Sequence, residues 1–489
     1  MSINSISVNF KGTTDIYSIT DSHQDTRKTR TLLSEVVKEA KKNNNVLLLN
    51  CGDMFKGIYP KELEADSFVK AKDMAPGLEI VTTLGNNDFG FSEENLNYLI
   101  STLKRFAQKG IKTVSANIFD KKSGQRPDWL KPYTIVERDG DKNFITGFCI
   151  NNINTEALSI TPVNQEDVIE EIKSYIEKEK PDNVIFLNHD YLKSSKKLAD
   201  NAQKAGIHID AMIGGHDHKP DGHLHFDERI YYPPPFSEAA LHFEIDKKGD
   251  SKKIKNLKML PYEEVKIEDS MLEGLKEYEQ KEGLLNPLAP CRINFTKKYS
   301  DPCSLGSFLA DEIKDKTDSD ICIYSTGLLV KPLPYGEKPI TNYDFKKTMM
   351  AHLPIQKVEL TPQELKNIFE HSLKMRTMDI SGNSKFLQAS SNIKIQGICD
   401  KTAQKYTVTQ IHINGVPVLG NKNISKIVCA IDEYIGKGGQ GYKILADKEK
   451  QNTKLTIDNA LKHALTATAM DYPKGSLYPS YEINERVIE

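Results

Sequence analysis

Five short segments, far apart along the chain, carry side chains of the kinds that bind divalent cations. In order they read Asp21-Ser22-His23, Gly52-Asp53, Gly85-Asn86-Asn87-Asp88, Asn188-His189 and Gly214-Gly215-His216-Asp217-His218. Any one of them alone is more often a solvated loop than a set of ligands. Together, carboxylate and amide oxygens with imidazole nitrogens form a donor set that suits Mn, Zn or Fe and is poor for Ca. A carboxylate such as Asp53 can bridge two ions ~3.5–4 Å apart, the separation at which they hold a phosphate and lower the pKa of a shared water.

Strand-like runs must position these segments, because each segment follows a short apolar stretch. The runs are 16–19, 46–49, 80–84, 184–187 and 211–213, with a further one at 111–114. Helical patterns lie between them, notably from Leu32 to Ala40 and from Asp167 to Glu179. Alternating strands and helices predict an α/β layered domain. Since catalytic loops lie beyond the carboxyl ends of the strands, we expect all five segments on the same edge of one sheet.

The second half of the chain has a different pattern, which predicts a separate, mixed α+β domain. Residues 262–283 are charged and helical in pattern, and Pro287 and Pro290 then interrupt the helix. We therefore expect domains at 1–262 and 299–489, joined by a connecting helix and linker over 263–298. Within the second domain, the apolar spacing from Leu305 to Ile313 predicts one helix, and the capping box Thr361-Pro362-Gln363-Glu364 starts another. Strand-like runs occur at 321–324, 357–360, 411–413 and 427–430.

The composition excludes several classes of protein. The 66 basic and 68 acidic residues nearly cancel, so no bulk charge favours nucleic acid or anionic lipid. No apolar run approaches the ~18 residues that a membrane span requires, and the first residues lack the apolar core of a secretory signal. The seven cysteines are scattered without a C-x-x-C pair, which argues for a reducing compartment. We expect a cytoplasmic protein, or an exported one if a leader has been removed, with neither a nucleic-acid polymer nor a membrane as partner.

The five segments resemble, in order and spacing, the motifs of the calcineurin-like metallophosphoesterases, and specifically of the two-domain 5′-nucleotidase family. That family has Asp-x-His, Gly-Asp, Gly-Asn-His-Glu, an isolated His and Gly-His-x-His, and the resemblance spans residues 14–220. It implies a layered β-sandwich flanked by helices, followed by a smaller α+β domain that binds substrate. It also implies two divalent ions, Mn, Zn or similar. By motif, one ion would be bound by Asp21, His23, Asp53 and His218, and the other by Asp53, Asn86, His189 and His216.

One departure from the family concerns catalysis. The family's catalytic His is replaced by Asn87, and the Asp that orients that His is replaced by Gly90. Asn87 can donate a neutral hydrogen bond but cannot carry a proton or a positive charge. By analogy with the loss of an oxyanion-hole donor, the replacement costs ~10²–10³ in rate, while a metal-activated hydroxide would remain. His223 and His225 are candidates for a replacement imidazole, although two surface histidines are the commoner interpretation.

The resemblance continues more loosely through residues 300–446 and implies a nucleoside site. Tyr434 corresponds to an aromatic residue that stacks on the base. The stretch Gly438-Gly439-Gln440-Gly441-Tyr442 resembles a Gly-Gly-Asp-Gly-Tyr turn with Gln440 in place of the acidic residue. Because residues 442–445 have a strand-like pattern, this glycine stretch is interpreted as a turn and not as a phosphate-binding loop. An expected arginine is missing from the segment 325–330, and the second stacking aromatic is missing near His352.

Three functions remain open. The first is hydrolysis of a phosphomonoester, most simply a nucleotide, by attack of a metal-bound hydroxide on phosphorus, with Asn86 and Asn87 near the phosphate oxygens. The second is hydrolysis of cyclic or linear phosphodiesters, in which the role of the missing dyad has changed. The third is a protein that binds metal and nucleotide with weakened catalysis or none. In each case the partner is a small phosphate ester.

Overall fold

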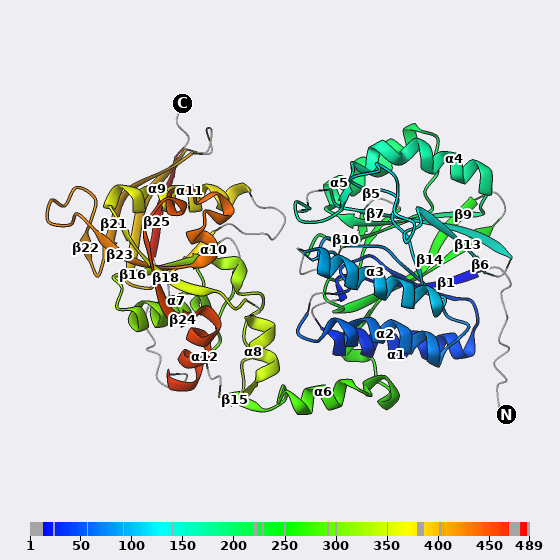
Figure 1. Cartoon of the computed structure of the whole chain (residues 1–489), viewed down its shortest axis with the longest axis horizontal. Helices are drawn as coiled ribbons and strands as arrows, with labels where there is room; N and C mark the ends of the chain where they lie inside the picture. The colour runs from blue at the N-terminus through cyan, green and yellow to red at the C-terminus, as the bar shows by residue number, and fades with distance from the viewer. Residues whose placement is uncertain are drawn as a thin grey trace, which may run out of the picture. The chain divides into compact units, whose positions relative to one another are not determined.

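The computed structural model describes residues 13–486 except 23–24, 56, 91, 139, 152, 154, 219–222, 227–228, 249–250, 291–292, 299–300, 350, 379–385, 401–402, 404 and 469–479. The chain divides into two compact units, residues 1–278 and 279–489 (Figure 1). Each unit has its own sheets and its own buried core. Over the described ranges, no helix combines the length and the apolar character that crossing a membrane requires.

The first sheet of the N-terminal unit places three of the five segments. Its strand order is β14-β13-β1-β2-β3-β4, with β1 to β4 parallel and β13 and β14 antiparallel. Helices α1 (Thr26–Lys42), α2 (Lys61–Met74) and α3 (Glu93–Gln108) cover one face of it (Figure 1). The strands are β1 (Thr13–Ile19), β2 (Val46–Asn50), β3 (Glu79–Thr82), β4 (Lys112–Thr113), β13 (Ala239–Lys248) and β14 (Ser251–Pro261).

A second sheet places the other two segments. Its order is β11-β12-β10-β9-β7-β6, and β7, β9, β10 and β12 run parallel. Helices α4 (Ile169–Glu179) and α5 (Leu192–Lys204) cover its outer face. The strands are β6 (Tyr133–Arg138), β7 (Asp141–Cys149), β9 (Asn183–Asp190), β10 (Ala211–His216), β11 (His223–Phe226) and β12 (Ile230–Tyr232), while β5 (Ile118–Asp120) pairs separately with β8 (Ile160–Pro162).

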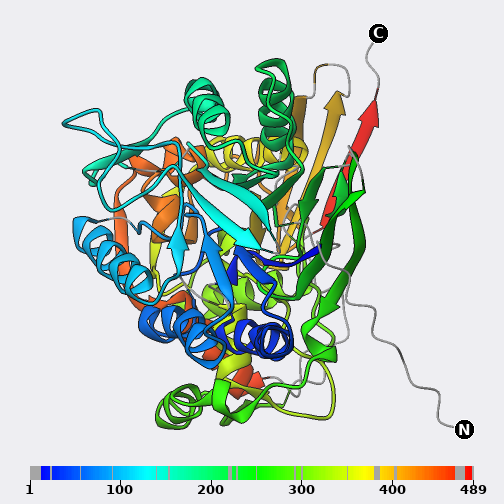
Figure 2. The same cartoon turned by 90° about the vertical axis from the view of Figure 1, so that its right-hand side faces the viewer.

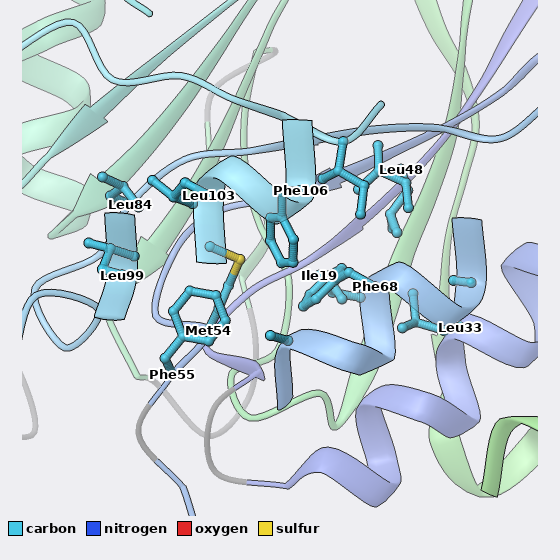
Figure 3. Close-up of a cluster of buried hydrophobic side chains, with 14 of the residues drawn as sticks. Ile19, Leu33, Leu48, Met54, Phe55, Phe68, Leu84, Leu99, Leu103 and Phe106 are labelled. Carbon is cyan, nitrogen blue, oxygen red and sulfur yellow. The ribbon is translucent and has the colours of Figure 1, made fainter. Parts of the chain in front are cut away.

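The two sheets pack face to face, so the unit is a sandwich with helices on both outer faces. Side chains alternate along each strand. Ile19 and Leu48 therefore lie in the cluster beneath α1 to α3, whose closely packed members are drawn in Figure 3. Ile16 and Leu49 lie in the cluster between the sheets, which also contains Ile185. This confirms the layered sandwich that the resemblance implied. The expectation of one sheet, drawn from the strand pattern, was wrong: the segments come from two sheets whose carboxyl ends meet.

The segment that was expected to be a connecting helix, residues 262–283, is only partly helical. It contains two single turns of 3₁₀-helix, Tyr262–Glu264 and Asp269–Leu272, followed by α6 (Leu275–Lys281). Gly274 separates the second turn from α6 and has a φ of +72°, a left-handed value that ends a helix. The charged pattern predicted the polarity of this segment correctly but not its breaks.

The C-terminal unit is built on a mixed sheet of order β19-β16-β23-β18-β24, and its second sheet has the order β22-β21-β20-β25. Figure 2 shows the red strand β25 beside the gold strands of that second sheet, and β25 pairs in parallel with β20. The strands of the two sheets of this unit are β16 (Ile321–Ser325), β18 (Pro354–Leu360), β19 (Leu387–Ala389), β20 (Ile393–Asp400), β21 (Lys405–Ile413), β22 (Val416–Pro417), β23 (Ile427–Asp432), β24 (Lys450–Thr456) and β25 (Ser480–Arg486). Separately, β15 (Pro287–Ala289) pairs with β17 (Ile340–Thr341).

The helices of this unit include the two that the sequence predicts. The helix α9 (Pro362–Met378) starts at the expected capping box, in which Glu364 N donates to Thr361 Oγ1 over 3.2 Å and Thr361 N donates to Glu364 Oε2 over 2.8 Å. The strand expected at 442–445 was wrong, because residues Lys443–Ala446 form a single helical turn. The others are α7 (Ser304–Thr317), α8 (Asn342–Thr348), α10 (Glu433–Gly436), α11 (Lys443–Ala446) and α12 (Ile457–Thr468).

Candidate metal centre

The ends of the strands in both sheets bring the predicted ligands together. Ligand atoms of Asp53, His189 and His216 lie within 4.8 Å of one another, and so do those of Asp21, Asp53 and His218. Asp53 belongs to both groups. It follows β2 of the first sheet, whereas His189 and His216 lie at the ends of β9 and β10 in the second. His23 lies outside the described residues.

Three of these residues have backbone conformations that non-glycine residues rarely adopt. The φ values of Asp21, Asp53 and His216 are +49°, +53° and +75°. A left-handed conformation costs a non-glycine residue ~1–3 kcal/mol and persists only where the surrounding structure imposes it. All three are residues whose side chains converge, and backbone strain at such residues is typical of functional sites.

Two glycines allow the loops to approach closely. A Cβ on Gly85 would lie 2.2 Å from Asp53 Oδ1, and a Cβ on Gly215 would lie 2.6 Å from the Cys51 carbonyl oxygen. No real Cβ tolerates such contacts, so glycine is required at both positions. Gly85 thus lets the loops after β2 and β3 approach each other within the first sheet, and Gly215 lets β10 of the second sheet approach the end of β2.

His189 is oriented by the backbone of the opposite sheet. Its Nδ1 lies 2.7 Å from the carbonyl oxygen of Cys51, which fixes Nδ1 as the donor and turns Nε2 toward the ligand cluster. Nε2 lies 3.2 Å from Asn86 Oδ1 and 3.4 Å from Asp53 Oδ2. Burial lowers the pKa of His189, but the Asp53 carboxylate outweighs it and raises the pKa to about 10. The pKa shift shows that the surrounding oxygens strongly favour a positive charge at this point.

His216 has the opposite character. Both of its ring nitrogens are buried and have no hydrogen-bond partner in the described part of the chain. Burial and the neighbouring His189 lower its pKa to about 3, so the ring is neutral. Its ring packs edge-on against Tyr191, with 4.6 Å between centroids. A neutral imidazole with unsatisfied buried nitrogens is what a divalent cation requires of a ligand, so this side chain fits a metal.

Asp21 and His218 form the other side of the cluster. His218 Nε2 lies 2.8 Å from Asp21 Oδ1. Burial would raise the pKa of Asp21, but His218 outweighs it and the pKa falls to about 2. The outer edge of His218 contacts Phe236, with 4.6 Å between ring centroids. The carboxylate is therefore ionised at any ordinary pH and available to a cation.

The segment after β3 holds Asp53 in place. Asn87 donates to both carboxylate oxygens of Asp53, from its backbone N over 2.8 Å and from its Nδ2 over 2.5 Å. Asp88, whose role the sequence did not reveal, accepts hydrogen bonds from the backbone N–H groups of Gly85, Asp53, Met54 and Phe55. Asp88 thus ties the loop after β2 to the loop after β3. Only its position two residues after Asn86 hinted at this role.

The backbone at Gly90, where the family has the Asp of its catalytic dyad, does not accommodate an aspartate. Gly90 has a φ of +66°, and a Cβ there would lie 2.6 Å from Asn95 Cβ. An aspartate at this position would be strained and would clash. His223 and His225 lie on β11, but their side chains are outside the described part of the chain.

The predicted substrate residues lie together in the C-terminal unit. Tyr434, on α10, is 46% exposed. A Cβ on Gly439 would lie 2.6 Å from the carbonyl oxygen of Tyr434, and Gly438 has a φ of +84°. Gln440 Oε1 accepts a hydrogen bond from Ser325 Oγ over 3.0 Å. The backbone carbonyl oxygen of Gln440 lies 3.1 Å from His371 Nε2. Sequence reasoning missed Ser325 and His371, which are distant in the chain.

The fold and the donor set of the N-terminal unit together define a metal-dependent phosphoester hydrolase. Two family models match the chain: "Calcineurin-like phosphoesterase" over residues 14–220 and "5′-nucleotidase, C-terminal domain" over residues 286–447. The chain belongs to the two-domain 5′-nucleotidase family of the calcineurin-like phosphoesterases.

Individual relatives agree with this assignment. An uncharacterized metallophosphoesterase, YunD of Bacillus subtilis, is 23% identical over 69% of this chain and 74% of its own length. A 5′-nucleotidase-related protein of Glossina morsitans morsitans is 22% identical over 87% of this chain and 83% of its own. The crystal structure of a 5′-nucleotidase precursor from Thermus thermophilus has a TM-score of 0.73 at 16% identity, covering 97% of this chain and 99% of that one. At that identity the structural likeness supports the fold.

Proposed function

We propose that this protein hydrolyses nucleotide phosphomonoesters at a pair of divalent cations bridged by Asp53. The observation that carries the proposal is that Asp53 is shared by two ligand groups, one with His189 and His216 and one with Asp21 and His218. Asn86 supplies an amide oxygen to the first group, and the motif pattern adds His23 to the second. Oxygen and imidazole ligands in this ratio suit Mn²⁺ or Zn²⁺.

The residues have distinct roles in the proposed reaction. When bound, the cations would neutralise the phosphate and supply a nucleophilic water at neutral pH. Asn87 holds both oxygens of Asp53 and thereby fixes the bridging carboxylate, and its amide is the nearest replacement for the lost imidazole as a donor to the phosphate. His189 is oriented through Cys51 so that its Nε2 remains in the cluster.

The C-terminal unit supports a nucleotide as the substrate. It matches the 5′-nucleotidase C-terminal domain, and the relative from Glossina is named a 5′-nucleotidase-related protein. Tyr434 presents an exposed aromatic ring beside a tight glycine turn, as base stacking requires. Gln440 adds an amide close to the same turn, where it would contact the sugar in place of the family's carboxylate.

Hydrolysis of an activated aryl phosphate in the presence of Mn²⁺ tests the proposal directly. We expect Asp53→Asn to abolish the activity, because it removes the charge shared by both ligand groups. Asp73→Asn, at an exposed ion pair with Lys109 on the same unit, is the control and should retain the wild-type rate. Equal rates for wild type and Asp53→Asn would rule out hydrolysis at this centre.

A second candidate function is hydrolysis of phosphodiesters, with weak turnover as a related possibility. The observation in its favour is the Asn87 and Gly90 pair, which leaves the usual position of the proton donor without an imidazole. A thermal-shift panel of nucleotides, cyclic and linear diesters and sugar phosphates separates the classes. Stabilisation by diesters alone would favour the second function over the first.

We further propose that the protein works in a reducing compartment such as the cytoplasm. The six cysteines within the described ranges are free and buried. Thiols that are unpaired and buried are typical of proteins in a reducing compartment, where disulfides are rare. Fractionation of the native host with an antibody against the protein tests this location.

A further inference from the structure

A third group of ligand atoms lies on the first sheet, at the opposite end of β1 from the centre described above. Ligand atoms of Asp15, His242 and Glu244 lie within 4.8 Å of one another. Asp15 is six residues before Asp21 along an extended strand, which separates the two places by ~20 Å at 3.3 Å per residue. The group is therefore independent of the dinuclear centre and of the proposed function.

The sheet register places the two carboxylates directly against each other. Asp15 of β1 pairs with Glu244 of β13, and Tyr17 pairs with His242. Like charges directly opposite on one face of an antiparallel pair destabilise it unless something neutralises them. His242 completes the triangle: its Nε2 lies 3.4 Å from Asp15 Oδ1, and its ring packs on Tyr17 at 4.5 Å between centroids.

His242 is the second observation that points to a ligand. Its side chain is only 8% exposed, and its Nδ1 is buried with no hydrogen-bond partner among the described residues. The nitrogen that faces the carboxylates is Nε2, so an otherwise buried imidazole offers this atom to the group as a ligand. A divalent cation would neutralise both carboxylates and accept the lone pair of His242 Nε2, with the ring proton on Nδ1.

The backbone around the group is shaped to hold it. The pairing of β13 with β14 shifts between His242 and Glu244, and Asn256 in β14 has a φ of +53° at this bulge. As a result, Asn256 Nδ2 donates to Glu244 Oε1 over 2.8 Å. On the other side, Asn43 at the end of α1 donates from its Nδ2 to Asp15 Oδ2 over 2.8 Å. Bulges commonly redirect side chains at functional sites, and here two amides orient the two carboxylates.

Carboxylates make the potential around Tyr17 negative, and one cationic residue, Lys255 of β14, pairs with Glu244 in the sheet register. Burial raises the pKa of the Tyr17 phenol, and four carboxylates raise it further, those of Glu39, Asp15, Glu35 and Glu244. Such a field attracts cations to this part of the sheet.

We propose that Asp15, His242 and Glu244 bind a third divalent cation, of the borderline class that includes Zn²⁺ and Mn²⁺, which cross-links β1 to β13. One imidazole and two carboxylates suit these ions. The site is structural: it joins the first strand of the fold to the last long hairpin of the same unit, β13 and β14, more than 200 residues later in the chain.

Counting metal ions tests the proposal. Metal-free full-length protein is titrated with Zn²⁺ by calorimetry, and bound metal is then measured by elemental analysis after gel filtration. We expect Glu244→Gln to bind one equivalent fewer than wild type, or to bind that equivalent ~100-fold more weakly, because it loses a charged ligand. Aryl phosphate hydrolysis should be unchanged, which also shows that the variant is folded. Asp15→Asn is a second variant with the same expectation.

Glu39→Gln is the matched control, because Glu39 adds to the same negative field without belonging to the ligand group. It should bind as many equivalents as wild type. Equal metal content in wild type, Glu244→Gln and Asp15→Asn would overturn the proposal and indicate that other groups balance the two carboxylates. An equal loss of affinity in Glu39→Gln would also overturn it, since that result indicates diffuse attraction and not a site.

Discussion

Asn87 donates two hydrogen bonds to Asp53, one from its backbone and one from its side chain. An imidazole at this position could also donate a hydrogen bond, and unlike the amide it could carry a proton. The replacement therefore exchanges a group that can protonate a leaving oxygen for one that orients the bridging carboxylate. Substitution of this one residue therefore distinguishes a slow phosphomonoesterase from a site adapted to another ester or to binding.

Asn87→His is predicted to speed hydrolysis of nucleotide monoesters, by ~10²-fold if the new imidazole acts as a general acid. Asn87→Ala, which removes the amide that donates to Asp53, should lower the rate below that of wild type. The measurement is kcat/KM for a nucleoside monophosphate with Mn²⁺ across neutral pH. If Asn87→His were no faster than wild type, the site would have to be regarded as adapted to another ester or to binding.

Gly90→Asp is predicted to destabilise the protein, even though it would complete the family's dyad. The φ of +66° strains any side chain, and the new Cβ would lie 2.6 Å from that of Asn95. We expect a loss of ~1–3 kcal/mol, measured as a lower urea midpoint. Asn95→Gly in the same chain should recover part of this loss by removing the clash, and a stable Gly90→Asp would contradict the backbone conformation described here.

The convergence of the ligand segments could be predicted from the sequence. Carboxylates, amides and imidazoles that follow strand-like runs in this combination are typical of metal centres. The role of Asp88 could not be predicted, since its four backbone partners come from loops 30 residues apart that only the fold brings together. The left-handed conformations of Asp21, Asp53 and His216 were equally hidden, because such strain depends on the surrounding structure and not on local preference.

At the scale of elements, local chemistry predicted the starts of helices better than their continuity. The capping box of α9 is a short-range signal that forms as expected. The expected helix over 262–283 breaks, because composition shows polarity and not where a chain must turn to meet the core. The strand expected at 442–445 failed for a related reason, since four residues of apolar pattern fit either a strand or a helical turn.

The helix α2 carries a buried carboxyl group that should make stability depend on pH. Glu64 is 3% exposed, and neither of its side-chain oxygens has a hydrogen-bond partner. Burial raises its pKa well above the ordinary value of 4.5, and nearby Asp88 raises it further. The folded protein then keeps a proton that the unfolded chain has released. The contribution to stability is complete below about pH 4.5 and is lost as the pH rises toward the folded pKa.

Glu64→Gln is therefore predicted to flatten the decline of stability above that pH, where one buried carboxyl group contributes up to ~1.4 kcal/mol per pH unit. Urea unfolding of the metal-free protein over a series of pH values measures this slope. Glu62→Gln, two residues earlier on the exposed side of α2, is the control and should leave the slope nearly unchanged. Identical slopes in wild type and Glu64→Gln would show that Glu64 is ionised in the folded state.

At the scale of the whole molecule, the family resemblance predicted the layered sandwich, whereas the strand pattern alone predicted the α/β class but not that two sheets share one site. Strand periodicity indicates which residues are buried and does not indicate whether two buried strands belong to the same sheet. The count of sheets follows from pairing across more than 100 residues, such as that of β1 with β13, which no local pattern encodes.

The contribution of the C-terminal unit to substrate choice is tested by Tyr434→Ala. Loss of one stacked base costs ~1–3 kcal/mol, so kcat/KM for a nucleoside monophosphate should fall at least ~5-fold while glycerol phosphate is hydrolysed as before. Tyr335→Ala, at another exposed tyrosine of the same unit, is the control. An equal fall for both substrates, or none for the nucleotide, would indicate that Tyr434 does not contact a base.

Asp53 lies in one layer of the sandwich, and His189 and His216 lie in the other. Binding of a metal ion would therefore depend on the two layers being packed together. An ion held by all three would fasten the layers at the point where their loops carry the most backbone strain. Chelation would then release that edge first, leaving the far edge of the layers paired. Protease cleavage after chelation should consequently begin in the loops that follow β2 and β10, well before the N-terminal unit unfolds as a whole.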